Sequence, residues 1–225
     1  MKMELINTGD GSHTIYLPEM DEQYHSVNGA ITESMHVYIE KGFSFYESSN
    51  AVVFEIGFGT GLNCMLTALE AKKNNKIVTY YTIEKYPLEH QIVQQLNYGK
   101  IISKRAEHIF QTIHECEWDE TVKVSENFYL RKIKADLTTV DLDSFENFNI
   151  IYFDAFGPDK QPEMWITDIF QKIYDQTSDN GIIVTYSAKG EVRRKLEVCG
   201  FTMERLPGPP GKKQMLRGIK RVTNS

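Results

Sequence analysis

The sequence has no apolar run that approaches the roughly 20 residues needed to cross a bilayer, and its start shows neither the apolar core of an export signal nor an arginine-rich targeting pattern. These absences exclude a helical membrane protein and predict a cytoplasmic protein with no membrane partner. Low-complexity tracts, internal repeats and interdomain linkers are also missing. We therefore expect a globular protein with a core of its own.

Cysteine is scarce. Cys64, Cys116 and Cys199 are far apart, form no C-x-x-C pair and have no histidine cluster nearby. This spacing argues against a disulfide framework and a zinc site, so we expect no metal centre. Cys64 and Cys199 fall in apolar helical patterns, which predicts small buried thiols.

The net charge is −6, which on its face argues against a nucleic-acid partner, but its distribution is uneven. Residues 189–221 contain ten basic and three acidic side chains, a net charge of +7, while the rest of the chain has 15 basic and 28 acidic ones, a net charge of −13. A polyanion would therefore have to bind the C-terminal end. A solvated basic face without a partner explains the pattern equally well.

With 225 residues, 41% hydrophobic and 25% charged, the chain can form one substantial core. From residue 52 onward apolar runs alternate with helical patterns, which predicts an α/β fold with a mostly parallel, Rossmann-like sheet. Residues 1–48 lack this alternation and are predicted to form a hairpin and a short helix, a substrate-side extension of the main domain, residues 49–225. The predicted strands are 52–56, 77–83, 128–133, 149–153 and 181–186, and the predicted helices are 62–73, 88–98, 106–114, 164–176 and 191–198.

The end of the chain breaks the alternation. Apolar segments 201–206 and 214–222 are joined by the turn Pro207-Gly208-Pro209-Pro210-Gly211, which leaves no room for a helix. Two strands joined so tightly must be antiparallel, so we expect a hairpin at the edge of the sheet.

The segment Val52-Val53-Phe54-Glu55-Ile56-Gly57-Phe58-Gly59-Thr60-Gly61 is the densest motif. A strand followed by glycines and a helix lets backbone amides approach a nucleotide closely. The third glycine comes one residue too early for the dinucleotide fingerprint G-x-G-x-x-G, and Glu55 would place negative charge beside a pyrophosphate. The motif therefore favours a cationic ligand with an amino-acid end, bound by Glu55, Gly57, Phe58, Gly59 and Gly61.

Acidic residues follow three more predicted strands. Glu84 ends the second strand, 23 residues after Gly61, a distance typical of a carboxylate that binds ribose hydroxyls. Asp136 is expected beside the adenine, and Asp154 follows the apolar strand 149–153. Because ligands of open α/β sheets bind outside the carboxyl ends of the strands, these carboxylates should meet in one crevice.

The glycine motif resembles motif I of the class I methyltransferases, which bind S-adenosylmethionine, a sulfonium cation without phosphate. The passage from Asp154 to Trp165 resembles the D-x-F-x-P-x-K-x-P-x-M-W signature of the tRNA 5-aminomethyl-2-thiouridine methyltransferase domain, the methylating half of MnmC-type wobble-uridine enzymes. The resemblance runs over nearly the whole chain. It departs from the family's G-F-G-x-K-R-E-M-L at Lys213-Gln214, and it matches a stand-alone form without the flavin oxidoreductase domain.

By this resemblance the chain methylates the aminomethyl group of a wobble uridine in tRNA, with S-adenosylmethionine as cofactor and no metal. Asp154 is then the catalytic residue, expected to accept a hydrogen bond from the amine and to orient its lone pair. The protein is expected to be a monomer that works beside separate uridine-modifying enzymes. The residues expected to contact substrate are Tyr24, Ser26, Glu33, Phe156, Lys160 and Trp165, with Arg193, Arg194, Lys212 and Lys213 for the tRNA phosphates.

Alternatives from other classes stay open. An aminopropyltransferase of the spermidine-synthase type, or another small-amine methyltransferase, would use the same fold and an acidic amine-binding crevice. A nicotinamide dehydrogenase is disfavoured by the glycine spacing, and an RNA-binding module without catalysis is disfavoured by the acidic residues at the strand ends. Binding of S-adenosylmethionine, measured by calorimetry, separates the transferases from the dehydrogenase and the RNA-binding module.

Overall fold

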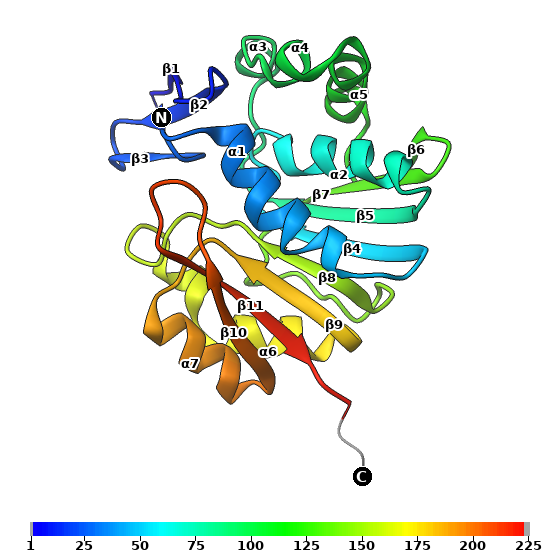
Figure 1. Ribbon diagram of the computed structural model, residues 1–225, viewed down its shortest axis with the longest axis vertical. Coiled ribbons are helices and arrows are strands. Elements are labelled where there is room, and N and C mark those ends of the chain that lie inside the picture. The colour runs from blue at the N-terminus through cyan, green and yellow to red at the C-terminus, as the bar shows by residue number, and fades with distance from the viewer. Residues whose placement is uncertain (1, 223–225) are drawn as a thin grey trace.

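An eight-stranded sheet forms the centre of the computed structural model, which describes residues 2–222. Figure 1 shows the strands in the order β10-β11-β9-β8-β4-β5-β7-β6. Strands β9, β8, β4, β5 and β7 are parallel to one another, whereas β6, β10 and β11 pair antiparallel with their neighbours. The strand bounds are β4 Asn50–Ile56, β5 Ile77–Glu84, β6 Thr121–Ser125, β7 Phe128–Lys134, β8 Phe148–Phe153, β9 Thr177–Thr185, β10 Phe201–Pro207 and β11 Gln214–Lys220.

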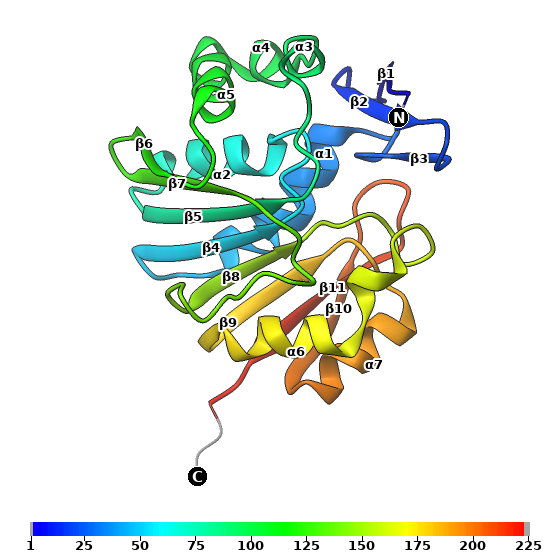
Figure 2. The same cartoon turned by 180° about the vertical axis from the view of Figure 1, so that it is seen from behind.

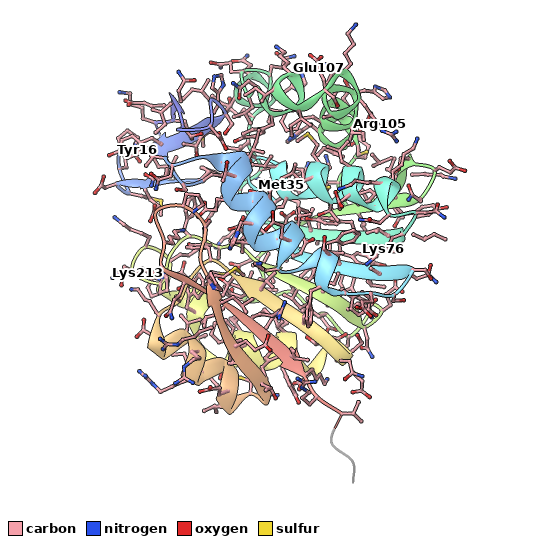
Figure 3. All side chains as sticks on the ribbon, in the orientation of Figure 1. Tyr16, Met35, Lys76, Arg105, Glu107 and Lys213 are labelled. Atoms are coloured by element: carbon pink, nitrogen blue, oxygen red, sulfur yellow. The ribbon has the colours of Figure 1, made fainter. Side chains whose placement is uncertain are left out.

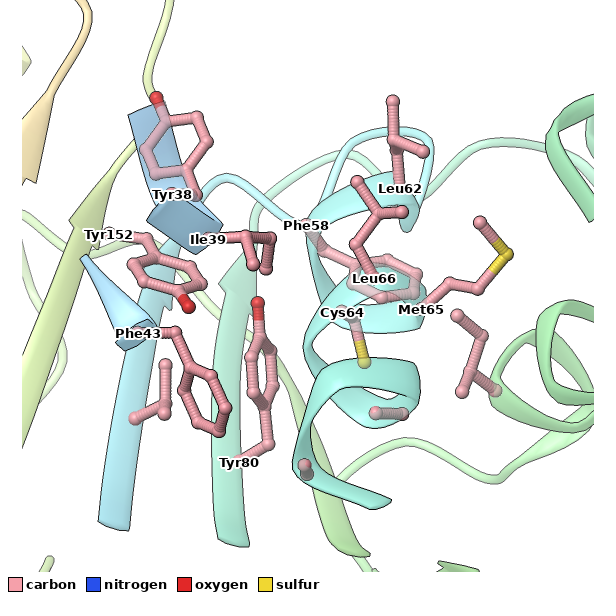
Figure 4. Packing of buried hydrophobic residues seen from close by; sticks show 14 of the residues in the cluster. Tyr38, Ile39, Phe43, Phe58, Leu62, Cys64, Met65, Leu66, Tyr80 and Tyr152 are labelled. Carbon is pink, nitrogen blue, oxygen red and sulfur yellow. The ribbon is translucent and has the colours of Figure 1, made fainter. Parts of the chain in front are cut away.

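Helices cover both faces of this sheet, as the two opposite views show (Figures 1 and 2). Because side chains alternate along a strand, Ile150 and Tyr152 of β8 pack in one core, and Ile151 and Phe153 pack in the other. Figure 4 shows part of the first core, where Tyr38, Phe43 and Tyr152 lie together. The first core is covered by α1 Ala30–Ser34, π-helix η1 Met35–Glu40, 3-10 helix η2 Phe43–Phe45, α2 Leu62–Lys73 and α5 Lys104–Glu115, and the second by 3-10 helix η3 Pro162–Trp165, α6 Thr167–Asp175 and α7 Gly190–Val198.

The N-terminal segment forms a small antiparallel sheet of β1 Glu4–Asn7, β2 His13–Leu17 and β3 Glu22–Gln23, one strand more than the expected hairpin. Ile15 and Leu17 of β2 are buried in the same core as α1 and η1. The segment therefore shares apolar packing with the main sheet.

Two predicted helices differ from the structure, and one observed strand has no predicted counterpart. The helix 88–98 is wrong: α3 His90–Val93 and α4 Tyr98–Ile102 replace it. Asn97 begins α4 instead of continuing a helix, because its side chain accepts a hydrogen bond from the His13 amide (2.8 Å) and donates one to the carbonyl of Gly11 (3.0 Å). The helix 164–176 is split at Ile166, which has extended backbone, and strand β6 was not predicted.

The remaining strands and helices lie where the alternation predicts them, and the C-terminal hairpin at the sheet edge is confirmed. Cys64 and Cys199 are buried and unpaired, as expected. No helix within residues 2–222 is long and apolar enough to span a membrane. In the same part of the chain, no three or more His, Cys, Asp or Glu side chains gather as metal ligands would.

Candidate active site

A cavity of about 1230 Å³ lies at the carboxyl ends of β4, β5 and β8. The glycine turn, Glu84, Asp136 and Asp154 line one side of it, and residues of the N-terminal segment and the β10–β11 loop line the other. This volume exceeds the roughly 300–1,000 Å³ of an ordinary small-molecule site, so the cavity has room for two ligands side by side. It also brings together twelve of the residues selected from the sequence: Tyr24, Ser26, Glu33, Gly57, Phe58, Gly59, Glu84, Asp136, Asp154, Phe156, Lys160 and Lys212.

The glycine turn after β4 needs glycine at two cavity positions. Gly57 has φ +89°, and a Cβ there would lie 2.9 Å from the carbonyl oxygen of Asp154. Gly59 has φ +48°, and a Cβ there would lie 3.1 Å from the ring of Tyr24. Both positions combine a backbone that disfavours L side chains with a crowded neighbour, so the turn presents bare backbone to the cavity.

Glu84 and Asp136 carry negative charge into the same cavity. Glu84 accepts hydrogen bonds from the backbone amides of Gly59 (3.1 Å) and Tyr86 (2.8 Å), which fixes its carboxylate against the glycine turn. Asp136 pairs with Lys85 at 2.7 Å and accepts from the Thr138 hydroxyl, and the Lys85 ammonium is the main reason that the pKa of Asp136 falls to about 2. Both carboxylates are therefore held in place before any ligand binds.

Asp154 lies between two side-chain donors that are far from it in sequence. The Tyr38 hydroxyl donates to its Oδ1 at 2.5 Å, and Nδ2 of Asn63 donates to its Oδ2 at 2.8 Å. Burial raises the pKa of Asp154 to about 7, the Glu33 carboxylate adds to this rise, and the two hydrogen bonds oppose it. Near neutral pH this carboxyl is thus able both to accept and to release a proton.

The far wall of the cavity holds a second charged group. Glu33 is buried and accepts hydrogen bonds from the Lys212 ammonium (2.7 Å) and from the Ser26 amide (2.8 Å). The Lys212 ammonium lies 4.0 Å from the centre of the Tyr186 ring, and the Tyr186 hydroxyl donates to the carbonyl of Ala155. The ion pair between Glu33 and Lys212 ties the β10–β11 loop to α1 across the cavity.

A family model described as S-adenosyl-L-methionine-dependent methyltransferase matches residues 94–221, more than half of the chain. The chain belongs to this methyltransferase family. The cofactor of the cavity is therefore S-adenosylmethionine, as the charge of its carboxylates and the glycine spacing led us to expect.

Curated relatives of this methyltransferase carry a more specific name. A protein of Campylobacter hominis is 30% identical over 171 residues, 75% of this chain, and one of Actinobacillus pleuropneumoniae serotype 5b is 26% identical over 235 residues, 94% of this chain. Both are named tRNA 5-methylaminomethyl-2-thiouridine biosynthesis bifunctional protein MnmC. The chain spans 25% and 34% of the length of these two relatives.

Solved structures support the fold of the methyltransferase. The crystal structure of MNMC2 from Aquifex aeolicus superposes with a TM-score of 0.81 at 23% identity, covering 99% of this chain and 72% of that one. Spermidine synthase from Thermotoga maritima superposes with a TM-score of 0.55 at 11% identity, over the same shares. At these identities the two structures establish the α/β fold of the methyltransferase.

Several residues selected from the sequence lie outside the cavity lining. Glu55 is fully buried behind the glycine turn, and Gly61 begins α2 and packs against His114. Trp165 is 1% exposed, and its indole nitrogen donates to the carbonyl of Phe156 at 2.7 Å, so it packs in the second core and supports the loop that follows Asp154. None of these three residues lines the cavity, because other protein atoms surround them, and their contact with a ligand stays a prediction.

The basic residues expected to contact tRNA are spread over two elements. Arg193 and Arg194 lie on α7, where Arg193 is paired with Glu197 at 2.5 Å. Lys213 is exposed on the β10–β11 loop next to Lys212 (Figure 3). Arg193 and Lys212 already have acidic partners, which lowers their availability for phosphates, whereas Arg194 and Lys213 take part in none of the ion pairs formed by residues 2–222.

The sequence analysis missed Tyr38 and Asn63, both of which contact Asp154. Asn63 had a recognisable signal, because it is a polar side chain in the otherwise apolar first turn of the helix that follows the glycines. Tyr38 had none, since it reaches the site only through the packing of η1 on the sheet.

Proposed function

We propose that this methyltransferase transfers the methyl group of S-adenosylmethionine to the primary amine of a 5-aminomethyl group on a wobble uridine of tRNA. Two observations support the proposal. The relatives named for this tRNA modification align over the segments that build the cavity. The cavity itself ends in Asp154, a half-buried carboxyl beside Glu33, which suits an amine substrate. The single observation that carries the proposal is the position of the Asp154 carboxyl in the cavity, next to Glu33.

The residues that line the cavity fit the cofactor. Bare backbone at Gly57 and Gly59 leaves room that a Cβ would fill, and Glu84 keeps lone pairs for ribose hydroxyls. Asp136 lies beside the apolar side chains of Ile83 and Leu137, a combination suited to an adenine. When bound, S-adenosylmethionine supplies an electrophilic methyl group on a sulfonium centre.

The chain's own residues then prepare the amine. An alkylammonium has a pKa near that of lysine, about 10.4, and must lose a proton before its nitrogen can attack. A free aspartate with a pKa of about 3.9 would be a poor acceptor, but burial brings the pKa of Asp154 to about 7 and narrows the difference. Its carboxylate accepts an N–H of the amine, while Tyr38 and Asn63 prevent it from rotating. In the transfer the nitrogen would gain the methyl group as the S–C bond breaks, with the electron pair of that bond staying on sulfur. The proton that the amine loses would pass through the Asp154 carboxylate to solvent.

The anticodon loop has to reach the cavity from outside. Tyr24 and Phe156 pack edge to face at 5.1 Å in its wall, and Lys160 anchors the same wall by donating to the carbonyl of Met20. These aromatic rings are placed to stack on an unpaired base, and Arg194 and Lys213 are free to contact phosphates. The protein then acts in the cytoplasm, beside enzymes that install the aminomethyl group.

The test is methyl transfer from labelled S-adenosylmethionine to tRNA that carries 5-aminomethyl-2-thiouridine, followed by nucleoside analysis. We expect label in 5-methylaminomethyl-2-thiouridine and none in tRNA that lacks the aminomethyl group. A free polyamine with decarboxylated cofactor tests the aminopropyltransferase alternative, which the acidic cavity wall also suits. Product from that pair and none from tRNA would contradict the proposal.

A further inference from the structure

Two buried acceptor oxygens behind the active site have no hydrogen-bond partner: Oε1 of Glu55 and Oδ1 of Asn63. The buried hydroxyl of Tyr80, which faces Glu55, has none either. Glu55 lies on β4 and is 0% exposed, and its other oxygen accepts a hydrogen bond from the Thr82 hydroxyl at 2.8 Å. Buried polar groups in native proteins are nearly always paired, and the side chains of Glu55 and Asn63 lie within hydrogen-bonding reach of each other, so their two unpaired oxygens need an explanation. Two acceptors cannot pair with each other unless one of them carries a proton.

The surroundings of Glu55 disfavour a negative charge. The ionisable groups that face it are the phenols of Tyr80 and Tyr152, the thiol of Cys64 and the carboxyl of Asp154, and all of them are neutral or acidic. None of the ion pairs within residues 2–222 includes Glu55. Burial raises the pKa of Glu55 to about 8, Asp154 adds to the rise, and hydrogen bonding with Thr82, Asn63 and Tyr80 opposes it. A proton on Glu55 removes both the buried charge and its repulsion from Asp154.

We propose that Glu55 is a neutral carboxylic acid that donates its Oε1 proton to Oδ1 of Asn63 and so positions Asp154 for the amine. The role in positioning rests on the proposed function. Asn63 already donates through Nδ2 to Oδ2 of Asp154. One proton therefore completes a chain from Glu55 through Asn63 to Asp154 and satisfies both unpaired oxygens. Glu55 is a positioning residue in this account. It acts on Asp154 through Asn63, so it does not have to line the cavity itself.

The protonation state can be measured without any reaction. Infrared spectra of the protein labelled with ¹³C-glutamate should contain the carbonyl band of one protonated glutamic acid at pH 7. Among the glutamates of residues 2–222, only Glu55 is both fully buried and without a cationic partner. The band should be absent from Glu55→Gln and should disappear from the wild type as the pH rises through about 8. Aspartate carries no label, so Asp154 does not contribute. Absence of the band at pH 7, or its persistence in Glu55→Gln, would overturn the inference.

Kinetics on labelled cofactor and tRNA test the positioning role. Glu55→Ala and Asn63→Ala should each lower kcat by about 100-fold with little change in KM for S-adenosylmethionine, because a misplaced catalytic group costs that order of rate. The double variant should lose no more than either single one, since the two side chains act in series. Glu55→Gln, whose amide also donates to Asn63, should recover most of the kcat that Glu55→Ala loses.

The opposite kinetic pattern contradicts this role. If Glu55→Gln is as slow as Glu55→Ala, or if its main effect is a higher KM for the cofactor, Glu55 acts as an anion at the cofactor site. Failure of the proposed function is recognised separately. A protein that methylates no tRNA still gives a decisive infrared spectrum, whereas active protein without the glutamic acid band removes this inference alone.

Discussion

The hydroxyl of Tyr38 lies 2.5 Å from Oδ1 of Asp154, although the two residues are 116 positions apart. Tyr38 belongs to the π-helix η1, and Asp154 follows the central strand β8. Tyr38 is buried and packs against Tyr152 with 5.2 Å between the ring centres, so its hydroxyl has little freedom to move. The N-terminal segment therefore helps to set the ionisation state of the proposed catalytic carboxyl.

Replacement of Tyr38 by Phe should make methyl transfer more dependent on pH. The tyrosine hydrogen bond favours the ionised carboxyl, so its loss should raise the pKa of Asp154 above about 7. At pH 7 the ionised fraction then falls, and kcat should drop by about tenfold, with partial recovery at pH 9. A kcat–pH profile checks this, and an equal loss at every pH would mean that the hydroxyl serves only packing.

Gly57→Ala should weaken cofactor binding as well as stability. The added Cβ would meet the backbone oxygen of Asp154 at 2.9 Å, and that backbone atom cannot turn aside as a flexible side chain could. Gly11→Ala is the matched control, because Gly11 has a similar φ of +81° but nothing within 4 Å of an added Cβ. Both variants should lose about 1 kcal/mol of unfolding free energy from the left-handed backbone. Gly57→Ala should lose more than Gly11→Ala because of the added contact with Asp154.

Calorimetry with S-adenosylmethionine separates the two glycine variants. Affinity should fall by at least about tenfold in Gly57→Ala, the equivalent of about 1.4 kcal/mol, and stay at the wild-type level in Gly11→Ala. Equal affinities in the two variants would show that the turn does not touch the cofactor.

Asp154→Asn should change the pH dependence of stability. The pKa of Asp154 rises from 3.8 in the unfolded chain to about 7 in the folded protein. Its contribution to stability is therefore fully present below pH 3.8 and is lost as the pH rises through 7. The unfolding free energy of Asp154→Asn, relative to wild type, should accordingly increase between pH 4 and pH 8 in urea titrations.

Asp136→Asn serves as the control of opposite sign. Lys85 lowers the pKa of Asp136 to about 2, so ionised Asp136 stabilises the folded state above pH 3.8. Its replacement should cost stability at neutral pH, with no change between pH 5 and pH 8. A flat difference for both variants would mean that burial does not shift the pKa of Asp154.

Binding of tRNA should weaken as salt rises, and neutralisation of Arg194 and Lys213 should reduce that dependence. Each lost phosphate contact lowers the slope of log affinity against log salt by about one. Arg193 and Lys212 should contribute less, because Glu197 and Glu33 already pair with them. Lys100→Ala, an exposed cation on α4, is the control and should leave the slope unchanged.

Sequence patterns predicted the parallel sheet and most of the cavity, because both follow from local rules. Alternating apolar runs place β4, β5 and β8 side by side, and the carboxyl ends of parallel strands must meet. Glu84, Asp136 and Asp154 could therefore be assigned to one crevice without a structure. The short helices α3 and α4 could not, because the contact of Asn97 with the N-terminal sheet overrides the local helical pattern.

At the site, the sequence did not show which residues of each motif are buried and which line the cavity. Glu55 and Trp165 belong to motifs whose other members line the cavity, but both side chains are buried away from it. A strand end places two successive side chains on opposite faces, and a motif does not say which face is wet. Tyr38 shows the converse, since a residue outside every motif reaches the catalytic carboxyl through tertiary packing.

The most direct test compares wild type and Asp154→Asn for S-adenosylmethionine affinity and for methyl transfer to tRNA bearing 5-aminomethyl-2-thiouridine. We predict affinities within about twofold of each other, and a kcat for the variant that is lower by about 100-fold or more, the size expected for loss of a positioned proton acceptor. A variant that methylates this tRNA at the wild-type rate would contradict the account.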